Sequence, residues 1–365
     1  MTSAKDPLNI GLKQSIKDEA RRLGFVLAGV TTPDPPPHAS FYEDWIAQGR
    51  HASMRYLAEE SARLRRSNPR LLMPDCKAIL MLAVPYSNPA RAPLVPGSPQ
   101  AKSAVGKTAA YSWGEDYHLV LPKRLEAIAR FIEKRVGHPV ASRWYTDSGP
   151  ILERDLAQRA GLGWIGKNTC LINPKMGSYI LLAELFLDLD IEPDLPFRSD
   201  HCGTCTRCIE ACPTGCILAD RTLDAGQCIS YLTIELKNSI PPDLRPLVGN
   251  WVFGCDICQV VCPWNRFAPP VGHAAFGQQD RLFEANLISE LEVGSAAFDR
   301  KFTGSPLRRS KHSGYQRNVA VVLGNVAGLD AIPALRAAAE GDQTMAAEHA
   351  SWAIDQIKER AGSDV

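Results

Sequence analysis

Cysteine is the residue type whose spacing points most clearly to chemistry in this sequence. Nine of the 11 cysteines lie in the segment 202–262. Its first part, Cys202-x2-Cys205-x2-Cys208-x3-Cys212-Pro213, has the spacing of bacterial ferredoxins, in which the first three thiolates bind one 4Fe-4S cluster and the fourth binds the other. A second, partial run follows as Cys255-x2-Cys258-x3-Cys262-Pro263. The two runs predict two 4Fe-4S clusters.

The same rule assigns most of the cluster ligands. It gives the first cluster four thiolates, from Cys202, Cys205, Cys208 and Cys262. The second cluster takes Cys212, Cys255 and Cys258 and needs one more ligand, because Val252 stands where the missing cysteine would be. Cys228 and Cys216 are the two choices. We favour Cys228, since Cys216 follows Cys212 too closely to reach the same cluster easily.

A structural zinc site is the simpler alternative for a dense cysteine segment. Zinc takes four ligands in a closed tetrahedral site, so it does not explain the long first run. The three remaining cysteines are predicted to be buried and inert, namely Cys76, Cys170 and Cys216.

No second cofactor motif accompanies the clusters. The segment Gly161-Leu-Gly163-Trp-Ile-Gly166 matches G-x-G-x-x-G, but it follows a helical stretch and precedes a strand, the reverse of the dinucleotide-binding order. No P-loop is present. Composition and spacing therefore indicate an iron-sulfur protein and leave its substrate open.

The elements around the cysteines divide the chain into three parts. Residues 1–195 read as mixed α/β. Apolar periodicity and turn residues predict helices over 12–25, 41–57 and 116–136, a loop over 89–103, and strands over 78–85, 142–146, 170–172 and 179–187. Pro122 suggests that the third helix begins only there. We place the cluster domain at 196–275 and a helical module at 276–365, with helices over 318–327, 331–339 and 345–357 that suit a HEAT-like repeat.

Charge and hydropathy exclude some settings for the whole chain. Lys and Arg number 41 against 40 Asp and Glu, so any basic surface must be local. No apolar stretch reaches the roughly 18 residues of a membrane helix, and the first residues lack the apolar core of a signal peptide. We therefore expect a cytoplasmic protein without a membrane partner.

Several stretches together resemble the epoxyqueuosine reductase family, cobalamin-dependent iron-sulfur enzymes of tRNA modification. They are 111–118, Tyr145-Thr-Asp147-Ser-Gly-Pro150, 163–169, 201–213, Cys228-Ile-Ser-Tyr-Leu-Thr-Ile-Glu235 and 253–265. The resemblance covers nearly the whole chain. It implies an N-terminal cobalamin-binding domain, a ferredoxin-like insert with two clusters, a C-terminal helical module, and reduction of the wobble-base epoxide to an alkene. It also supports Cys228 as the eighth cluster ligand.

The resemblance implies that Asp147 is the proton donor to the departing alkoxide. For this role near neutral pH, burial would have to raise the pKa of Asp147. From the residues alone, an N-cap is the simpler interpretation of Asp147, because Asp147-Ser148 precedes a helical stretch starting near Pro150.

Cobalamin is implied by the resemblance alone. The motif D-x-H-x-x-G is absent, since Asp116-Tyr-His118 begins it but Leu121 ends it. We therefore expect cobalamin to bind without that histidine as its lower ligand. The residues that we assign to cobalamin contacts, each also readable as a surface charge or turn residue, are Arg70, Tyr111, Lys167, Asn168, Thr169, Ser178, Ser230 and Asp256.

Residues 300–317 hold six basic side chains and no acidic one. Such a segment suits contact with a phosphate backbone, although it also reads as a solvated basic loop. We expect the tRNA anticodon stem-loop to meet Arg308, Arg309, Lys311 and Arg317. The resemblance also favours a monomer that receives electrons from a low-potential donor.

Two other functions remain open at this level. A reductive dehalogenase shares cobalamin and two clusters, but it usually carries a twin-arginine signal, which this sequence lacks. A ferredoxin-type electron carrier needs only the cysteine segment, so the large N-terminal part argues against it.

Overall fold

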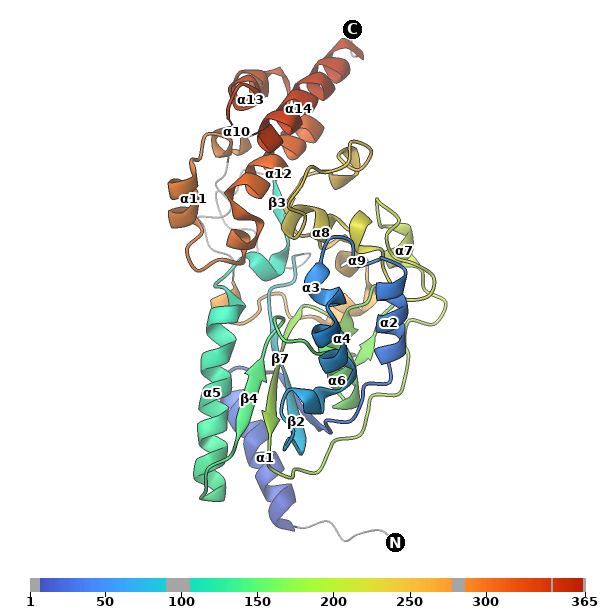
Figure 1. The fold of residues 1–365 in the computed structure, drawn as a ribbon, viewed down its shortest axis with the longest axis vertical. Helices are drawn as coiled ribbons and strands as arrows, with labels where there is room; N and C mark the ends of the chain where they lie inside the picture. Colours follow the sequence, from blue (N-terminus) through green and yellow to red (C-terminus); the bar gives the residue numbers. More distant parts are fainter. Residues whose placement is uncertain (1–6, 90–105, 278–285, 343, 364–365) are drawn as a thin grey trace.

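The computed structural model describes residues 7–89, 106–277, 286–342 and 344–363. Figure 1 shows a sheet with its helices toward one end of the molecule and the C-terminal helices at the other, with the cysteine-rich segment between them. In the described ranges, no helix is both long and apolar enough to span a membrane.

The N-terminal part is built on a four-stranded antiparallel sheet of order β1-β2-β7-β4. Its strands are β1 (Leu27–Thr31), β2 (Ala78–Pro85), β7 (Ile180–Leu187) and β4 (Ser142–Tyr145). Every residue of β2 is buried because the sheet is covered on both faces. The predicted mixture of helices and strands is confirmed, and the sheet contains no parallel pair among the described strands.

Helices pack against both faces of the sheet. On the first face, α1 (Pro7–Arg22) and α5 (Tyr117–Val136) share a core with alternate residues of β2 and β7. The second face packs against α6 (Glu153–Arg159), in a core that includes Met81, Leu156 and Phe186. Residues of β7 whose side chains point toward α6 therefore meet the first turn of that helix.

Three predicted elements differ from the structure. The helix expected over 41–57 is interrupted at Gly49, which has φ 68°, and appears as α2 (Ala39–Ala47) and α3 (Arg55–Ala58). Helix α5 begins before Pro122, because the Asp116 side chain accepts the His118 N–H and caps the first turn. The loop predicted over 89–103 lies almost wholly outside the described residues.

The strands predicted at 170–172 and 179–187 form, but they do not pair with each other. Strand β6 (Leu171–Ile172) pairs with β5 (Trp164–Ile165), while β7 joins the main sheet. The turn between them is closed by mutual backbone hydrogen bonds of Asn173 and Gly177. Because α6 precedes β5, the glycine triplet at 161–166 does follow a helix, as predicted.

The cysteine-rich segment has little regular structure. A two-stranded parallel pair, β3 (Lys107–Thr108) with β8 (Trp251–Phe253), joins it to the N-terminal part. Its short helices are α7 (Arg207–Glu210), α8 (Ile229–Ile234) and α9 (Ile257–Val260). Helix α4 (Glu60–Ser67) belongs to the N-terminal part.

The C-terminal helices are α10 (Leu287–Glu290), α11 (Ser295–Lys301), α12 (Lys311–Val326), α13 (Ile332–Ala339) and α14 (Thr344–Ser363). The three predicted C-terminal helices are present as α12, α13 and α14; α12 and α14 are longer than expected, α13 is one residue shorter, and two short helices, α10 and α11, were not predicted. Helices α12 and α14 approach closely at Gly324, where a Cβ would lie 2.6 Å from the Trp352 ring. Their core also includes Ile234, Val252 and Phe253 of the cysteine-rich segment, so the two parts share one apolar interior.

Candidate active site

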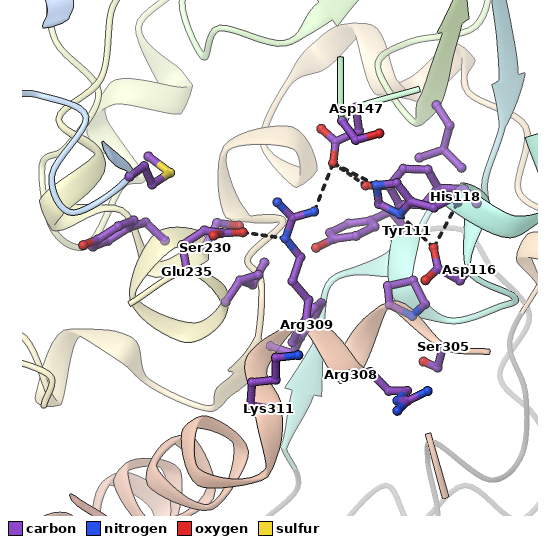
Figure 2. Close-up of a pocket in the computed structure, with 18 of the residues that line it drawn as sticks. Tyr111, Asp116, His118, Asp147, Ser230, Glu235, Ser305, Arg308, Arg309 and Lys311 are labelled. Carbon is purple, nitrogen blue, oxygen red and sulfur yellow. Dashed lines mark hydrogen bonds and ion pairs between the residues drawn. The ribbon is translucent and has the colours of Figure 1, made fainter. Parts of the chain in front are cut away.

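A cavity of about 1700 Å³ lies where the three parts of the chain meet. The N-terminal part contributes Tyr111, Tyr117 and Asp147, and the C-terminal part contributes Arg308 and Lys311. The cysteine-rich segment contributes Cys228 and Ser230. Figure 2 shows Asp147, His118 and Arg309 turned toward one another in this cavity. The volume exceeds the roughly 300–1,000 Å³ of ordinary small-molecule pockets, so the cavity has room for a large cofactor beside a substrate.

Asp147 is contacted in the cavity by side chains from several elements. It follows β4 in a left-handed backbone conformation, φ 58°, which a non-glycine residue adopts only when its surroundings require it. Tyr117 Oη donates to Asp147 Oδ2 over 2.7 Å, His118 Nε2 lies 3.5 Å from the same oxygen, and an Arg309 guanidinium nitrogen lies 3.7 Å from it. The N-cap alternative is wrong, since α6 starts at Glu153 and its N-cap residue is Leu152.

The charges around Asp147 keep it ionised. Burial raises its pKa, but the bonds from His118 and Tyr117 and the charge of Arg309 outweigh burial and lower the pKa to about 2. Our expectation of a raised pKa is therefore wrong for this structure. The corrin face on which that expectation relied is not part of the chain, whereas three donors of the chain converge on the carboxylate.

His118 holds the proton that Asp147 lacks. Burial lowers the pKa of His118, but its contacts with Asp116 and Asp147 outweigh burial and raise the pKa to about 9. Asp116 Oδ1 lies 2.8 Å from His118 Nδ1. At neutral pH the imidazolium thus stands between two carboxylates, with the Tyr117 ring stacked on it at 4.1 Å.

Known proteins were compared with the chain at the level of families, sequences and structures. Two family models match, "4Fe-4S double cluster binding domain" over residues 201–265 and "Epoxyqueuosine reductase QueG, DUF1730" over residues 66–148. The epoxyqueuosine reductase of Pseudomonas aeruginosa is 41% identical over 354 residues, covering 96% of each chain. That of Escherichia coli K12 is 36% identical, covering 97% of this chain and 92% of the relative. The chain belongs to the epoxyqueuosine reductase family.

Solved structures of the family agree with this assignment. A crystal structure of epoxyqueuosine reductase with an epoxyqueuosine-modified tRNA stem loop has a TM-score of 0.87 at 31% identity, covering 98% of this chain and 92% of that one. A Bacillus subtilis epoxyqueuosine reductase, described with its catalytic loop swung out of the active site, has a TM-score of 0.85 at 31% identity, covering 96% and 91%. Membership makes the chain an oxidoreductase of a family that uses cobalamin and two 4Fe-4S clusters.

The first predicted cluster site fits its cysteines. All four line one small cavity of about 40 Å³, together with Trp264 and His201 and no other cysteine of the described residues. The four cysteines that line it are Cys202, Cys205, Cys208 and Cys262. Four thiolates facing one enclosed space suit a cubane, whose irons each take one thiolate.

The second cluster site contains more sulfur than one cubane needs. Cys212 Sγ lies 3.5 Å from Cys216 Sγ, and Cys216 also contacts Cys228. Two sulfurs in van der Waals contact cannot bind two corners of one cubane without separating, which supports Cys216 as the spare residue. Cys228 lines the large cavity, so the second cluster would lie at its wall. Cys258 contacts Cys170, which also lines that cavity.

The predicted cobalamin contacts fall into three groups. Tyr111, Ser178 and Ser230 line the large cavity. Lys167 and Asn168 line the small cluster cavity instead, where Lys167 Nζ donates to Gly203 O (2.7 Å) and Cys205 O (3.0 Å). The stretch 163–169, one of those that resemble the family, therefore lies beside the predicted site of the first cluster.

The other three predicted contacts do not line the large cavity. Arg70 donates to Cys76 O at 2.9 Å and lies 3.6 Å from Asp34 on the outer side of the N-terminal part. Thr169 occupies a left-handed turn with φ 63°. Asp256 is buried and accepts the Ala110 N–H at 2.7 Å, and burial raises its pKa to about 7. Asp256 is bonded to the neighbour of Tyr111, which lines the cavity, and the assignment of all three residues to cobalamin stays a prediction.

The predicted tRNA contacts of the basic segment are also divided, between the cavity wall and the protein interior. Arg308, Arg309 and Lys311 line the cavity, and Arg309 also binds Glu235 at 2.6 Å. Arg317 is fully buried and donates only to groups inside the protein, so its assignment to tRNA is wrong. Spacing could not reveal this, since the helix that carries Arg317 turns it toward the cysteine-rich segment.

Sequence reasoning missed three residues of this site, Tyr117, His118 and Glu153. All three contact Asp147, and Tyr117 and His118 lie about 30 positions before it in the sequence. A carboxylate and an imidazole two positions apart, Asp116 and His118, was the available signal. Their role depends on the loop at Asp147, which no local pattern places next to them.

Proposed function

We propose that this chain reduces the epoxide of epoxyqueuosine in tRNA to the alkene of queuosine, with loss of water. One observation carries the proposal. A single cavity is lined by the acidic group Asp147, by the cluster cysteine Cys228 and by the basic residues Arg308 and Lys311. Protons, electrons and a phosphate backbone can therefore reach the same substrate.

The residues of the chain supply one of the two protons, and the second comes from solvent. Converting an epoxide to an alkene and water consumes two electrons and two protons. Asp147 is the group placed to protonate the departing oxygen, but it is ionised in this structure. We infer that the proton reaches Asp147 Oδ2 from His118 Nε2, 3.5 Å away, and that Asp116 stabilises the imidazolium before transfer.

Other residues would hold the cofactors. Tyr111, Ser178 and Ser230 line the part of the cavity suited to cobalamin, and Ser178 Oγ is fixed by a 2.9 Å hydrogen bond to Gln259. Cobalamin, when bound there, would supply a low-valent cobalt centre as the source of electron density for the reduction. The eight cluster ligands proposed are Cys202, Cys205, Cys208, Cys262, Cys212, Cys228, Cys255 and Cys258.

The substrate would enter past the basic rim. Arg308 and Lys311 are exposed at the cavity and suit phosphates of an anticodon stem-loop. We also propose that the chain has three domains, residues 1–195, 196–275 and 276–365, and that the last is HEAT-like. We further propose that the protein is a cytoplasmic monomer that receives electrons from a low-potential donor. The relative solved with an epoxyqueuosine-modified tRNA stem loop supports tRNA as the partner.

The test is conversion of epoxyqueuosine-containing tRNA by anaerobically purified, cofactor-loaded protein, followed by mass spectrometry of the nucleosides. We expect queuosine from the wild type and a loss of roughly 10²–10⁴-fold in Asp147→Asn. Glu126→Gln is the matched control, since the Glu126 side chain is 45% exposed on α5 and pairs with Arg130. Full iron and cobalt content without queuosine formation would refute the proposal.

A further inference from the structure

Glu184 is a carboxyl group in an unusual place. It lies in the middle of β7, opposite Tyr145 of β4 and Met81 of β2, and none of its surface is exposed. Neither of its oxygens accepts a hydrogen bond from any donor in the described parts of the chain. A buried carboxylate without a donor is strongly unfavourable, so Glu184 must carry a proton.

The group that Glu184 meets is another carboxyl. Its side chain contacts Glu153 in the first turn of α6, which packs on the same face of the sheet. Two carboxylates cannot donate to each other, whereas a carboxylic acid donates well to a carboxylate. Glu184 is therefore the donor and Glu153 the acceptor.

Glu153 connects this pair to the active site. It lines the large cavity, and its Oε1 accepts the backbone N–H of Asp147 at 2.5 Å. That bond fixes the residue whose backbone is left-handed. Without it, the short loop between β4 and α6 loses the contact that opposes its backbone strain.

We propose that Glu184 is a positioning residue, which by holding one proton keeps Glu153 as the anchor that docks the Asp147 loop in the cavity. The proposal rests on the role of Asp147 proposed above, and it assigns to Glu184 no contact with substrate. When the shared proton is lost, two adjacent buried carboxylates repel each other and the anchor breaks. When a second proton binds, Glu153 becomes a weaker, neutral acceptor.

The surrounding charges set the direction of the pH dependence. Asp147 faces the pair from the loop, Arg154 faces Glu153 from α6, and Tyr145 lies opposite Glu184 on β4. Burial and then the charge of Asp147 raise the pKa of Glu153 to about 7, and burial with the charge of Glu153 raises the pKa of Glu184 well above its usual range. The loop is thus expected to dock best above neutral pH and to undock when the pH rises far enough to remove the shared proton.

Two measurements that do not depend on turnover test the proposal. Infrared difference spectra of the cluster-loaded protein should show a protonated carboxyl band that shifts in D2O and is absent from Glu184→Gln. Glu290→Gln is the control, because Glu290 is a buried carboxyl that has donors in Lys301 and Tyr315. This control should retain the band.

Hydrogen exchange of the Asp147 amide measures loop docking. Glu153→Ala should accelerate this exchange by roughly tenfold to a hundredfold, as expected when a charge-assisted hydrogen bond is lost. Glu184→Gln keeps a neutral donor, so it should preserve protection and extend it to alkaline pH, where the wild type loses it beyond the intrinsic rise in exchange.

Absence of the protonated carboxyl band in the wild type would overturn the proposal even if a variant fails to fold. Unchanged exchange of the Asp147 amide in a folded Glu153→Ala variant would also overturn it. Confirmed docking in a protein that forms no queuosine would instead refute the proposed function and leave the anchor standing.

Discussion

Replacing Arg317 by Met should destabilise the protein without changing how it binds tRNA. Arg317 is fully buried in α12, and its guanidinium donates to the backbone carbonyls of Leu232, Leu236 and Asn238 at 2.6–2.8 Å. It also binds the side-chain oxygen of Asn318. Burial lowers the pKa of Arg317 to about 10, so the group is still charged at neutral pH.

The magnitude follows from the acceptors that lose their donor. Met fills a similar length but leaves three carbonyl oxygens and one amide oxygen without a partner, each at about 1–3 kcal/mol before the structure relaxes. Because the structure relaxes around these neutral acceptors, we expect a total loss of about 3–5 kcal/mol, at the upper end for a single substitution. At roughly 2–4 °C per kcal/mol, the midpoint of thermal unfolding should fall by about 6–20 °C.

Thermal unfolding of the cluster-loaded protein, followed by circular dichroism, measures this effect. Arg308→Met is the matched control, because Arg308 is exposed and pairs only weakly with Asp299 at 3.2 Å. Below its unfolding temperature, Arg317→Met should bind the stem-loop with an unchanged salt dependence, whereas Arg308→Met should reduce the slope by about 1. A stable Arg317→Met variant with a reduced salt slope would refute the reasoning and return Arg317 to the tRNA surface.

Two further predictions concern the active site and the clusters. Because the pKa of His118 is raised, its contribution to stability is fully present below pH 6.5 and is lost as the pH rises through about 9. The wild type should therefore lose stability across this range, and His118→Gln should not. If denaturation gives the two proteins the same pH profile, the Asp116–His118–Asp147 arrangement is contradicted. Cys228→Ser should lower the iron content from about eight toward four per chain, whereas Cys216→Ser should keep it, and the opposite result in an iron assay would make Cys216 the eighth ligand.

The sequence allowed the elements with strong local patterns to be predicted. The apolar run of β2 was found at its observed bounds, and α5 differs by one residue at its start, because a continuous apolar run and helical periodicity both reflect burial. The spacing of the two cysteine runs likewise predicted four residues that line one cavity, three from the first run and Cys262 from the second. These features arise from neighbours within a few residues of each other, or from a motif whose cofactor imposes the spacing.

Features that depend on distant contacts could not be predicted in this way. Arg309 lies 162 positions from Asp147, yet the two form an ion pair, and Arg317 reaches carbonyl groups about 80 positions earlier in the chain. A basic run shows how many charges are present but not which of them turn inward. The same limit explains why the sequence did not show that Arg70 and Lys167 lie outside the lining of the large cavity.

The charge state of Asp147 shows how the parts of this site depend on one another. A carboxylate with a pKa of about 2 is a poor acid, yet the donors that hold it in place are the same groups that lower its pKa. Positioning and acidity therefore oppose each other in the free enzyme. The opposition is relieved if the proton resides on His118 until it is needed, because the pair delivers one proton while Asp147 keeps its geometry. Glu153 fixes the backbone of Asp147, whereas His118 contacts its carboxylate. The position of the loop and the protonation of Asp147 can therefore be altered separately by substitution.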